Sequence, residues 1–536
     1  MADVKTVAPP SAPLPRGAKG HPWLTLLAVS LGVIMVMLDG TVVGIANPVI
    51  GQDLGASLAD LQWVTSGYLL ALAVFLITAG KLGDLFGHKR VFLIGVAGFA
   101  LTSLAIAFSE PIGETLGISP VGTLIGMRVL QGLFGALLNP AALALLRNAF
   151  PGEKLNAAMG AWGAIIGLSS AAGPIVGGLL VENVSWQSVF FINVPVGAVA
   201  LAMGLWIIME SKAQTLSRID WLGVLLLSVA MFSLVWAIIK APDWGWGDSR
   251  TLGFLAVTVV VGALFVLWQS KAREPLIPLS LFRNLSVSIG ILLMMLVAFA
   301  MFGAMFFLGF YFQGVHGLSP LDAGLRMLPM SAGMIIASPL AGMAIGKLGP
   351  KVTISGGMLI TAVSMFLMSR IGVEASFFET GLPFLLLAFG LSPVFVGATE
   401  IIVGNSPMEL AGVAGGVQQS AMQVGGAMGT AILGAVMAAE ISGTLPGHLG
   451  PVAKAMPPQA IEGLEKAAAF GTVPAEALKT VPEQVQQVIV TAVHHSFLDG
   501  MHLAFLISTI VAVGTALLAL LVKSGRKTEG APVHLG

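Results

Sequence analysis

Two charged side chains, Asp39 and Arg128, lie within long apolar segments, where an ionised group is costly unless it meets a partner or a wet cavity. Asp39 lies 16 residues beyond Trp23, or about 24 Å along a helix that rises about 1.5 Å per residue. Arg128 lies seven residues into a helix that enters from the other side, about 10 Å deep on the same rise. In an apolar core about 30 Å thick, the two charges reach similar depths, which allows an ion pair.

Such a pair would suit the exchange of protons. Burial favours the protonated form of an aspartate, whereas a neighbouring guanidinium favours the ionised form. A cavity that opens alternately to two sides of a membrane would change this balance, so Asp39 could bind a proton on one side and release it on the other. The simpler alternatives are that Asp39 only hydrogen-bonds a helix end and that Arg128 is structural. Glu400, near the end of a later apolar segment, is the next carboxyl that could contact a proton or a substrate.

The composition indicates an integral membrane protein. Hydrophobic residues make up 56% of the 536 residues and charged residues only 10%, against about 25% charge in a soluble domain. The 26 basic and 26 acidic residues balance, which argues against a nucleic-acid partner. The chain has no cysteine, and so no disulfide, thiol nucleophile or cysteine-based metal site. We predict neither a cofactor nor a metal ion, and membrane lipid as the surroundings.

Apolar segments of about 20 residues, the length that crosses a bilayer, indicate about fourteen transmembrane helices. Six lie in the first half of the chain, two in the middle and six in the second half. The predicted helices are 23–46, 62–79, 91–109, 121–145, 158–181, 190–209, 221–240, 252–270, 287–311, 323–345, 351–369, 382–403, 413–437 and 497–521.

This order predicts an all-α integral membrane protein in which two six-helix bundles flank two inserted central helices. The predicted parts are a cytoplasmic tail (1–22), an N-terminal bundle (23–209), the two inserted helices with their linkers (210–286), a C-terminal bundle (287–521) with an outside loop at about 438–496, and a cytoplasmic tail (522–536). Alternating Ala, Glu, Lys and Val with interspersed prolines predict one or two short amphipathic helices in the outside loop.

Lys and Arg are concentrated in alternate loops, and the positive-inside rule places those loops in the cytoplasm. The loops on the other side carry few basic residues, and half of these fall in the long segment 438–496. We therefore predict a multi-pass protein of the cell inner (plasma) membrane with both termini in the cytoplasm. The first apolar segment is long and lacks a small-residue cleavage site, so we expect it to remain as the first helix.

Residues 80–90 read Gly-Lys-Leu-Gly-Asp-Leu-Phe-Gly-His-Lys-Arg and form a predicted charged loop between two spans. The glycines permit a tight turn, the aspartate offers an acceptor to a helix N-terminus or a cation, and the basic residues hold the loop inside. The segment resembles motif A of the major facilitator superfamily, although Leu85 stands where that family usually has a basic residue. An ordinary positive-inside turn is the alternative. The resemblance implies a conformational role for Gly80, Asp84, Gly87, Lys89 and Arg90.

Three further segments resemble motifs of the same superfamily. Residues 124–136, which include Arg128, resemble motif B, and residues 38–48, which include Asp39, resemble the first-helix motif of its fourteen-helix drug:proton antiporters. Residues 173–178 resemble motif C, which those antiporters carry. Pro174 removes a backbone donor and its neighbouring glycines bare the helix face, so this helix could bend and slide against a neighbour. Simple close packing is the alternative role for the motif C residues Gly173, Pro174, Gly177 and Gly178.

A weak internal repeat supports two related halves. Aligning residues 342–352 with residues 80–90 pairs Gly80 with Gly342, Gly87 with Gly349 and Lys89 with Lys351. Both segments follow the second predicted helix of their half. Many transporters are built from such repeats.

The resemblance spans about 23–437 and 497–521 and implies a proton-coupled antiporter that works by alternating access. The implied substrates are hydrophobic, often cationic, drugs or antimicrobial compounds, with protons as the coupled ion. An exporter dedicated to one natural product or lipid fits the same residues, and a proton-coupled uptake symporter fits them less well. The sequence contains no His-Glu-x-x-His, Gly-x-Ser-x-Gly or Walker-type phosphate loop, so we do not predict an enzyme.

Overall fold

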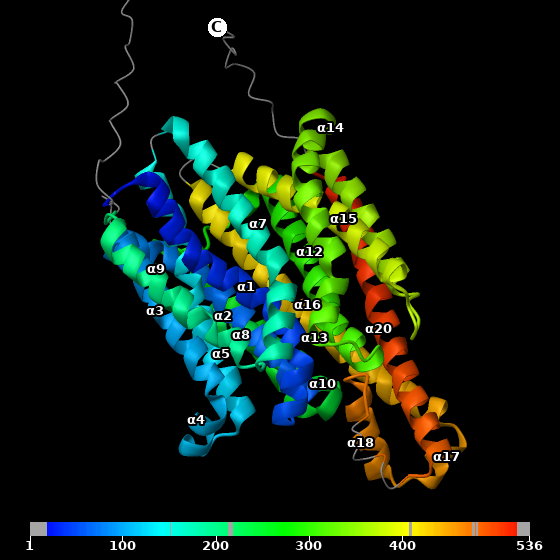
Figure 1. The fold of residues 1–536 in the computed structure, drawn as a ribbon. Coiled ribbons are helices and arrows are strands. Elements are labelled where there is room, and N and C mark those ends of the chain that lie inside the picture. Colours follow the sequence, from blue (N-terminus) through cyan, green and yellow to red (C-terminus); the bar gives the residue numbers. More distant parts are fainter. Residues whose placement is uncertain are drawn as a thin grey trace, which may run out of the picture.

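The computed structural model describes residues 19–150, 152–212, 218–406, 410–473, 478 and 481–522. Within these residues every regular element is a helix (Figure 1). A helix satisfies its own backbone hydrogen bonds, which is the requirement that a chain must meet in lipid. Large apolar side chains such as Trp206, Val259 and Ile510 are at least 70% exposed on the flanks, where lipid would cover them. The predicted tails lie almost wholly outside the described residues.

The first half of the chain forms six spans, which we call the N-terminal bundle. Two of these spans are made of two consecutive helices, and a short helix, α4 (Ser109–Leu116), lies between two spans. The spans are α1 (Pro22–Leu54), α2 (Leu58–Phe86), α3 (His88–Ala107), α5 (Pro120–Ala136) with α6 (Leu138–Ala149), α7 (Gly152–Asn183), and α8 (Ser188–Phe191) with α9 (Asn193–Ile207).

The two inserted helices are α10 (Trp221–Trp244) and α11 (Ser249–Lys271). They pack against each other, and α10 also packs against α2 and α16. The Asp220 carboxylate caps α10 and joins the insertion together, because it accepts from the Gly223 amide at 2.8 Å, from Trp268 Nε1 and Gln269 Nε2 at 2.7 Å, and from the Leu276 amide at 3.3 Å. Burial alone would raise the pKa of Asp220, but these hydrogen bonds together lower it.

The second half of the chain forms the C-terminal bundle. Its helices are η1 (Leu279–Arg283), α12 (Leu285–Phe310) with η2 (Tyr311–Val315), α13 (Pro320–Arg326), α14 (Leu328–Met368), α15 (Phe377–Gly404), α16 (Ala411–Leu449), α17 (Pro451–Ala455), α18 (Pro458–Ala468) and α20 (Glu483–Ala519). Thirteen helical stretches of the described residues are long and apolar enough to cross a membrane. The stretch Pro320–Met368 has 49 residues and breaks at Gly349. Dividing it there gives the fourteen spans that the sequence predicts.

The break at Gly349 repeats a break in the first half. Gly349 has φ 80° and ψ 161°, and Gly87, which separates α2 from α3, has φ 101° and ψ 133°. Residues with a side chain rarely adopt such a backbone conformation. The predicted pairing of Gly87 with Gly349 therefore corresponds to a similar break in the helix, made by a glycine with positive φ, once in each half of the chain.

The helices extend further than predicted at two connections. Residues 80–90 are not an open loop, because α2 continues to Phe86 and α3 begins at His88, so Gly87 alone makes the turn. At both ends of the predicted outside segment 438–496 the chain is helical, since α16 continues to Leu449 and α20 already begins at Glu483. These two helices pack side by side, and His448 Nε2 lies 2.6 Å from Asp499 Oδ2 between them. The short helices α17 and α18 lie in this segment, as predicted.

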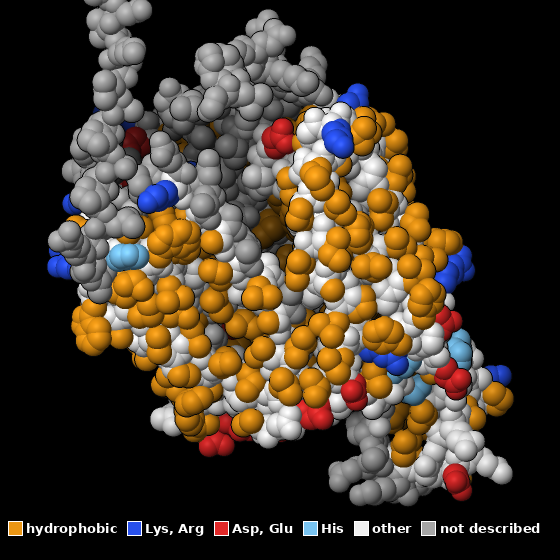
Figure 2. Space-filling model, turned by 45° about the horizontal axis from the view of Figure 1, so that its top comes forward, with side chains coloured by type: hydrophobic (Ala, Val, Ile, Leu, Met, Phe, Trp, Pro, Cys, Tyr) orange, Lys and Arg blue, Asp and Glu red, His pale blue; other side chains and the backbone are white. Residues whose placement is uncertain are grey.

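The contact between the two bundles differs between the two ends of the molecule. The first helix begins and the last helix ends at one end, which we call the terminal end, whereas α4, α17 and α18 lie at the opposite end (Figure 1). Helix α2 packs along α16, and α7 packs against α13 near the opposite end. Hydrophobic side chains cover most of the visible flank, and a hollow separates the bundles at the terminal end (Figure 2).

Replacing Gly349 with Ala should lower the stability of the protein. An added Cβ meets no atom within 4 Å, so the cost is backbone strain alone, about 1–3 kcal/mol for a residue held in such a region. Gly346, one turn earlier, also has open space but a helical backbone, so Gly346→Ala is the matched control. Thermal unfolding in detergent should show a lower midpoint only for Gly349→Ala. Equal midpoints for both variants would contradict the strained junction.

Candidate functional site

Asp39 of α1 and Arg128 of α5 form a buried ion pair in the N-terminal bundle. Nη1 of Arg128 donates to Oδ2 of Asp39 at 2.5 Å, and each side chain is only 1% exposed. The contact that the sequence allowed from helix depth is therefore present. The role of this pair in proton exchange stays a prediction.

Neutral polar side chains surround the pair. Gln131, on α5, accepts from Arg128 Nη1 at 2.5 Å and donates to Asp39 Oδ1 at 3.1 Å. Its amide nitrogen also donates to Ser103 Oγ of α3 at 2.6 Å. Arg128 Nε donates to the backbone carbonyl of Val64 at 3.0 Å. Both carboxylate oxygens of Asp39, and Nε and Nη1 of Arg128, thus have partners, and a buried ion pair requires such hydrogen bonds if it is to persist.

The sequence analysis did not identify Gln131 or Ser103. Gln131 could have been found, because residues three apart share one face of a helix and Arg128 was already a candidate. Ser103 lies on a different helix within an apolar run, and nothing in its neighbourhood marks it.

Tyr68 of α2 covers the pair on the side of the bundle interface. Its ring centroid lies 4.1 Å from Cζ of Arg128, close enough for the ring face to attract the cation. Its buried hydroxyl has no hydrogen-bond partner among the described residues. Tyr68 and Arg128 both line the large cavity described next, whereas Asp39 does not. Of the two charged partners, Arg128 is therefore the one that forms part of the cavity wall.

A cavity of about 1800 Å³ lies between the two bundles. Methionine and phenylalanine side chains form much of its wall, including Met37 of α1, Phe302 of α12 and Phe395 of α15. At the terminal end the lining includes Lys81, Asp84, His88, Arg147 and Lys212. The cavity therefore runs from the buried pair to the hollow at the terminal end.

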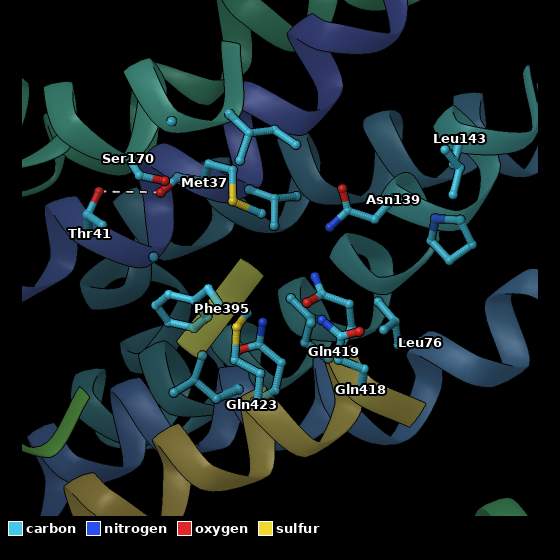
Figure 3. Close-up of a pocket in the computed structure, with 18 of the residues that line it drawn as sticks. Met37, Thr41, Leu76, Asn139, Leu143, Ser170, Phe395, Gln418, Gln419 and Gln423 are labelled. Carbon is cyan, nitrogen blue, oxygen red and sulfur yellow. Dashed lines mark hydrogen bonds between the residues drawn. The ribbon is translucent and has the colours of Figure 1, made fainter. Parts of the chain in front are cut away.

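Amide side chains line the cavity from both bundles (Figure 3). Gln418, Gln419 and Gln423 come from α16 of the C-terminal bundle, and Asn139 comes from α6 of the N-terminal bundle. Gln418 Nε2 donates to Thr399 Oγ1 at 2.6 Å. Gln423 Oε1 and Asn139 Oδ1 are buried and have no partner among the described residues. These groups can bind a polar ligand, since a buried amide without a hydrogen bond is costly.

The bundles make close contact toward the opposite end. A Cβ on Gly309 of α12 would lie 2.4 Å from the carbonyl oxygen of Gly44 in α1, so only glycine permits this approach. Gln313 Nε2 donates to the neighbouring carbonyl of Ile45 at 2.9 Å. Pro48 cannot donate to the Gly44 carbonyl within α1, which leaves that oxygen exposed to α12. The cavity is therefore closed on this side.

The motif C glycines make close contacts both within the N-terminal bundle and with the C-terminal bundle. Gly173 and Gly177 allow α7 to approach α1, because a Cβ would lie 1.8 Å from Thr41 Oγ1 at the first position and 2.8 Å from Val42 Cγ1 at the second. Gly178 instead faces Cα of Leu321 in α13, at 2.6 Å from an added Cβ.

Pro174 takes part in the same contact between α7 and α13. An added Cβ on Gly324 of α13 would lie 2.3 Å from the Pro174 carbonyl oxygen. One face of the motif C segment therefore packs against α1 of its own bundle, and the adjacent face packs against α13 of the other bundle.

The motif A residues connect the α2–α3 junction to the end of α9. The Glu210 carboxylate accepts from the Lys89 backbone amide at 2.9 Å and lies 3.8 Å from Arg90 Nε. It also occupies the space where a Cβ on Gly87 would lie. Lys89 Nζ donates to the Leu205 carbonyl at 2.9 Å.

Two other motif A residues face the mouth of the cavity. Asp84 Oδ1 lies 3.3 Å from His88 Nε2, and Asp84 lines the mouth together with Gly80. The structure thus gives Asp84 a partner in its own segment. Residues 407–409, which precede α16 at this end, lie outside the described residues.

Glu400 does not join the buried pair. Its side chain is exposed near the end of α15, and it is not among the residues that line the cavity. Thr399, its neighbour, does line the cavity. Because adjacent residues point to different sides of a helix, the sequence position alone could not decide which of the two faces inward.

A family model and the relatives of known name agree on one protein family. Residues 29–430 match the model of the Major Facilitator Superfamily. The chain is 53% identical over 460 residues to the tetracenomycin C resistance and export protein of Streptomyces glaucescens, which covers 85% of this chain and 84% of that protein. It is 36% identical to the multidrug resistance protein Stp of Mycobacterium tuberculosis, over 80% of this chain and 78% of that one. It is 33% identical to the multidrug efflux pump LfrA of Mycolicibacterium smegmatis, over 78% of this chain and 81% of that one.

Solved structures share the fold at low sequence identity. A bacterial homolog of the human lysosomal transporter Spinster, in an inward-facing and unoccupied conformation, has a TM-score of 0.63 at 15% identity and covers 93% of this chain and 97% of its own. A D-xylose-proton symporter has a TM-score of 0.58 at 14% identity, with 94% and 98% coverage. These similarities concern the fold alone.

Replacing Gly178 with Ala should open the contact at the opposite end. The added methyl group would meet the backbone of Leu321 and Pro320 at 2.6 Å, and a backbone cannot move aside as a flexible side chain can. Because the bundles move as bodies, the terminal end should close in response. Spin labels on Lys154→Cys and Lys347→Cys should report a shorter distance between the bundles at that end.

The matched control is Gly167→Ala on the same helix, where an added Cβ meets no atom within 4 Å. It should leave the spin-label distance at the wild-type value. An unchanged distance in Gly178→Ala would show that this contact does not hold the two bundles in their observed arrangement.

Proposed function

The chain belongs to the Major Facilitator Superfamily, and we propose that it is a proton-coupled antiporter that exports hydrophobic drugs or antimicrobial compounds across the cell membrane by alternating access. The observation that carries this proposal is a large cavity, open at one end, whose wall contains one member of a buried carboxylate–guanidinium pair. A cavity of this kind provides room for a substrate, and the carboxylate provides a place for a proton. The relatives named for resistance and export support the direction of transport.

In the proposed cycle, the observed arrangement is the state that has released its proton. Asp39 is then ionised and paired with Arg128, and a substrate that enters from the terminal end binds this ionised form in preference to the protonated one, so that its binding releases the proton. When the cavity opens to the opposite side, the substrate leaves and a proton binds Asp39. Protonation removes the counter-charge of a buried Arg128, and leaving a buried charge unpaired costs about 3–5 kcal/mol. That cost drives the rearrangement that returns the cavity to the terminal end.

We place the terminal end in the cytoplasm. Basic residues gather there, at the helix ends Lys81, Lys89 and Arg147 and at Lys212 after α9, and the cytoplasmic ends of spans are the ones that carry such residues. The chain lacks cysteine, so Lys271→Cys and Lys466→Cys can each be labelled without background. An impermeant maleimide added outside should label only the Lys466→Cys protein, and the reverse pattern would contradict this orientation.

A second candidate function is the export of one dedicated natural product. The observation that favours it is the 53% identity to a relative that is named for tetracenomycin C, higher than the 36% and 33% identity to relatives named as multidrug transporters. The two candidates share the proposed mechanism and differ in substrate range. A panel of structurally unrelated compounds in the export assay separates them.

Export is tested in an efflux-deficient host that expresses the chain. We expect the host to accumulate less of a fluorescent hydrophobic compound and to survive higher concentrations of antimicrobial compounds that the chain exports. A protonophore should abolish both effects, because the sequence contains no Walker-type phosphate loop and an ion gradient must supply the energy. Accumulation that is unchanged by the chain, or export that survives the protonophore, would contradict the proposal.

Replacing Asp39 with Asn should abolish substrate-driven proton release. The amide keeps the shape of the carboxyl but cannot exchange a proton, and the loss should be at least about a hundredfold, as for other residues that transfer protons. The measurement uses proteoliposomes that contain a pH-sensitive dye. Asp243→Asn is the matched control, because that carboxylate is 60% exposed and pairs with Lys240 far from the cavity. Wild-type proton release in the Asp39→Asn protein would move the proton site to another residue.

A further inference from the structure

The charges around the cavity are unevenly distributed. Among the described residues that line it, Lys81, Arg128, Arg147 and Lys212 are basic, and Asp84 is the single carboxylate. Asp84 lies at the mouth and already has His88 as a partner at 3.3 Å. Arg147 and Lys212 are exposed at the mouth and have no ion-pair partner among the described residues. The described lining of the entrance therefore carries more positive than negative charge, which favours anions over cations.

The deep part of the cavity has the same polarity. Arg128 lines the cavity and Asp39 does not, so a bound molecule meets the positive member of the pair at the cavity wall. A cation that entered this deep part would lose water and find no carboxylate among the described residues there, because the single carboxylate of the described lining, Asp84, lies at the mouth. Aromatic rings such as Phe302 and Phe395 can attract a cation, but by only about 0.5–2 kcal/mol, less than the several kcal/mol that removing an ion from water costs.

The neutral part of the wall fits a particular kind of molecule. Methionine side chains adapt to different apolar shapes, and Phe302, Phe306 and Phe395 offer flat faces for stacking. The amides of Asn139 and Gln423 can donate to carbonyl, phenol or carboxylate oxygens through nitrogen and accept from hydroxyl groups through oxygen. Their oxygens have no partner among the described residues, so a ligand hydroxyl would satisfy them.

We propose that this transporter selects flat, apolar compounds that carry carbonyl, phenol or carboxylate oxygens and no positive charge. The inference rests on the proposed export function and narrows its substrates to uncharged and anionic compounds. The basic mouth and Arg128 determine the charge preference. The amides of α6 and α16 determine the preference for oxygen-rich compounds.

Three anthraquinones that differ only at position 2 test this selection. The substituents are a carboxylate, a carboxamide and a trimethylammonium-methyl group, and binding to the purified full-length protein in lipid nanodiscs is measured by calorimetry. The carboxylate and the carboxamide should bind at least about tenfold more tightly than the cation, which corresponds to about 1.4 kcal/mol. A cation that binds as tightly as either of the other two compounds would overturn the inference.

Variants assign the preference to named side chains. Arg147→Gln combined with Lys212→Gln should weaken binding of the carboxylate about threefold, as expected for two partly screened charges, and should not affect the carboxamide. The matched control combines Lys271→Gln with Arg273→Gln, which removes two exposed charges from the same end outside the cavity lining. Gln423→Leu should weaken both compounds, whereas Gln487→Leu, exposed on α20, should weaken neither. Equal effects of variants and controls would overturn the assignment.

Export of the same three compounds from the efflux-deficient host separates this inference from the proposed function. Export of the carboxamide and the carboxylate but not of the cation is the expected result. Equal export of all three compounds would contradict the proposed charge preference but would still agree with the proposed antiporter function. Export of none, with the expected order of binding, would support the selectivity of the cavity and contradict the proposed export.

Discussion

The buried pair of Asp39 and Arg128 is the interaction on which the functional part of the structure depends. Neither ion could remain dry alone, since removing one partner of a buried pair costs about 3–5 kcal/mol. Val64, Gln131 and Ser103, from three helices, supply or orient the remaining hydrogen bonds. The pair therefore joins α1, α2, α3 and α5 into one unit. A change in the charge of Asp39 therefore affects the contacts of all four helices.

Close backbone contacts provide a physical route by which such a change could reach the other bundle. Asp39 lies on the same helix as Gly44, whose carbonyl meets Gly309 of α12. The α7 segment around Gly173 packs on α1 near Thr41 and continues to the contact of Gly178 with α13. In lipid, helices associate through such close packing of small residues. The site of charge and the site of bundle contact are thus neighbours on α1, which gives alternating access a physical route.

The sequence predicts the helices well because each span must be long and apolar. It also indicates the pairing of Gly87 with Gly349, because only glycine adopts the backbone conformation found at both junctions. Connections were harder to predict, since the lengths of α2 and α16 beyond the apolar core depend on packing with neighbours.

The same distinction holds within the site. Helix depth brought Asp39 and Arg128 together, but depth could not place Glu400, which lies outside the cavity lining, or reveal Ser103. Which side of a helix faces the cavity is a property of the assembled bundles, and a uniformly apolar segment does not encode it locally.

The protonation state of Asp39 can be measured directly by infrared difference spectroscopy of the purified protein on addition of an exported compound. The account predicts that a protonated-carboxyl band decreases in the wild type and is absent from Asp39→Asn, and the same band in both proteins would contradict it.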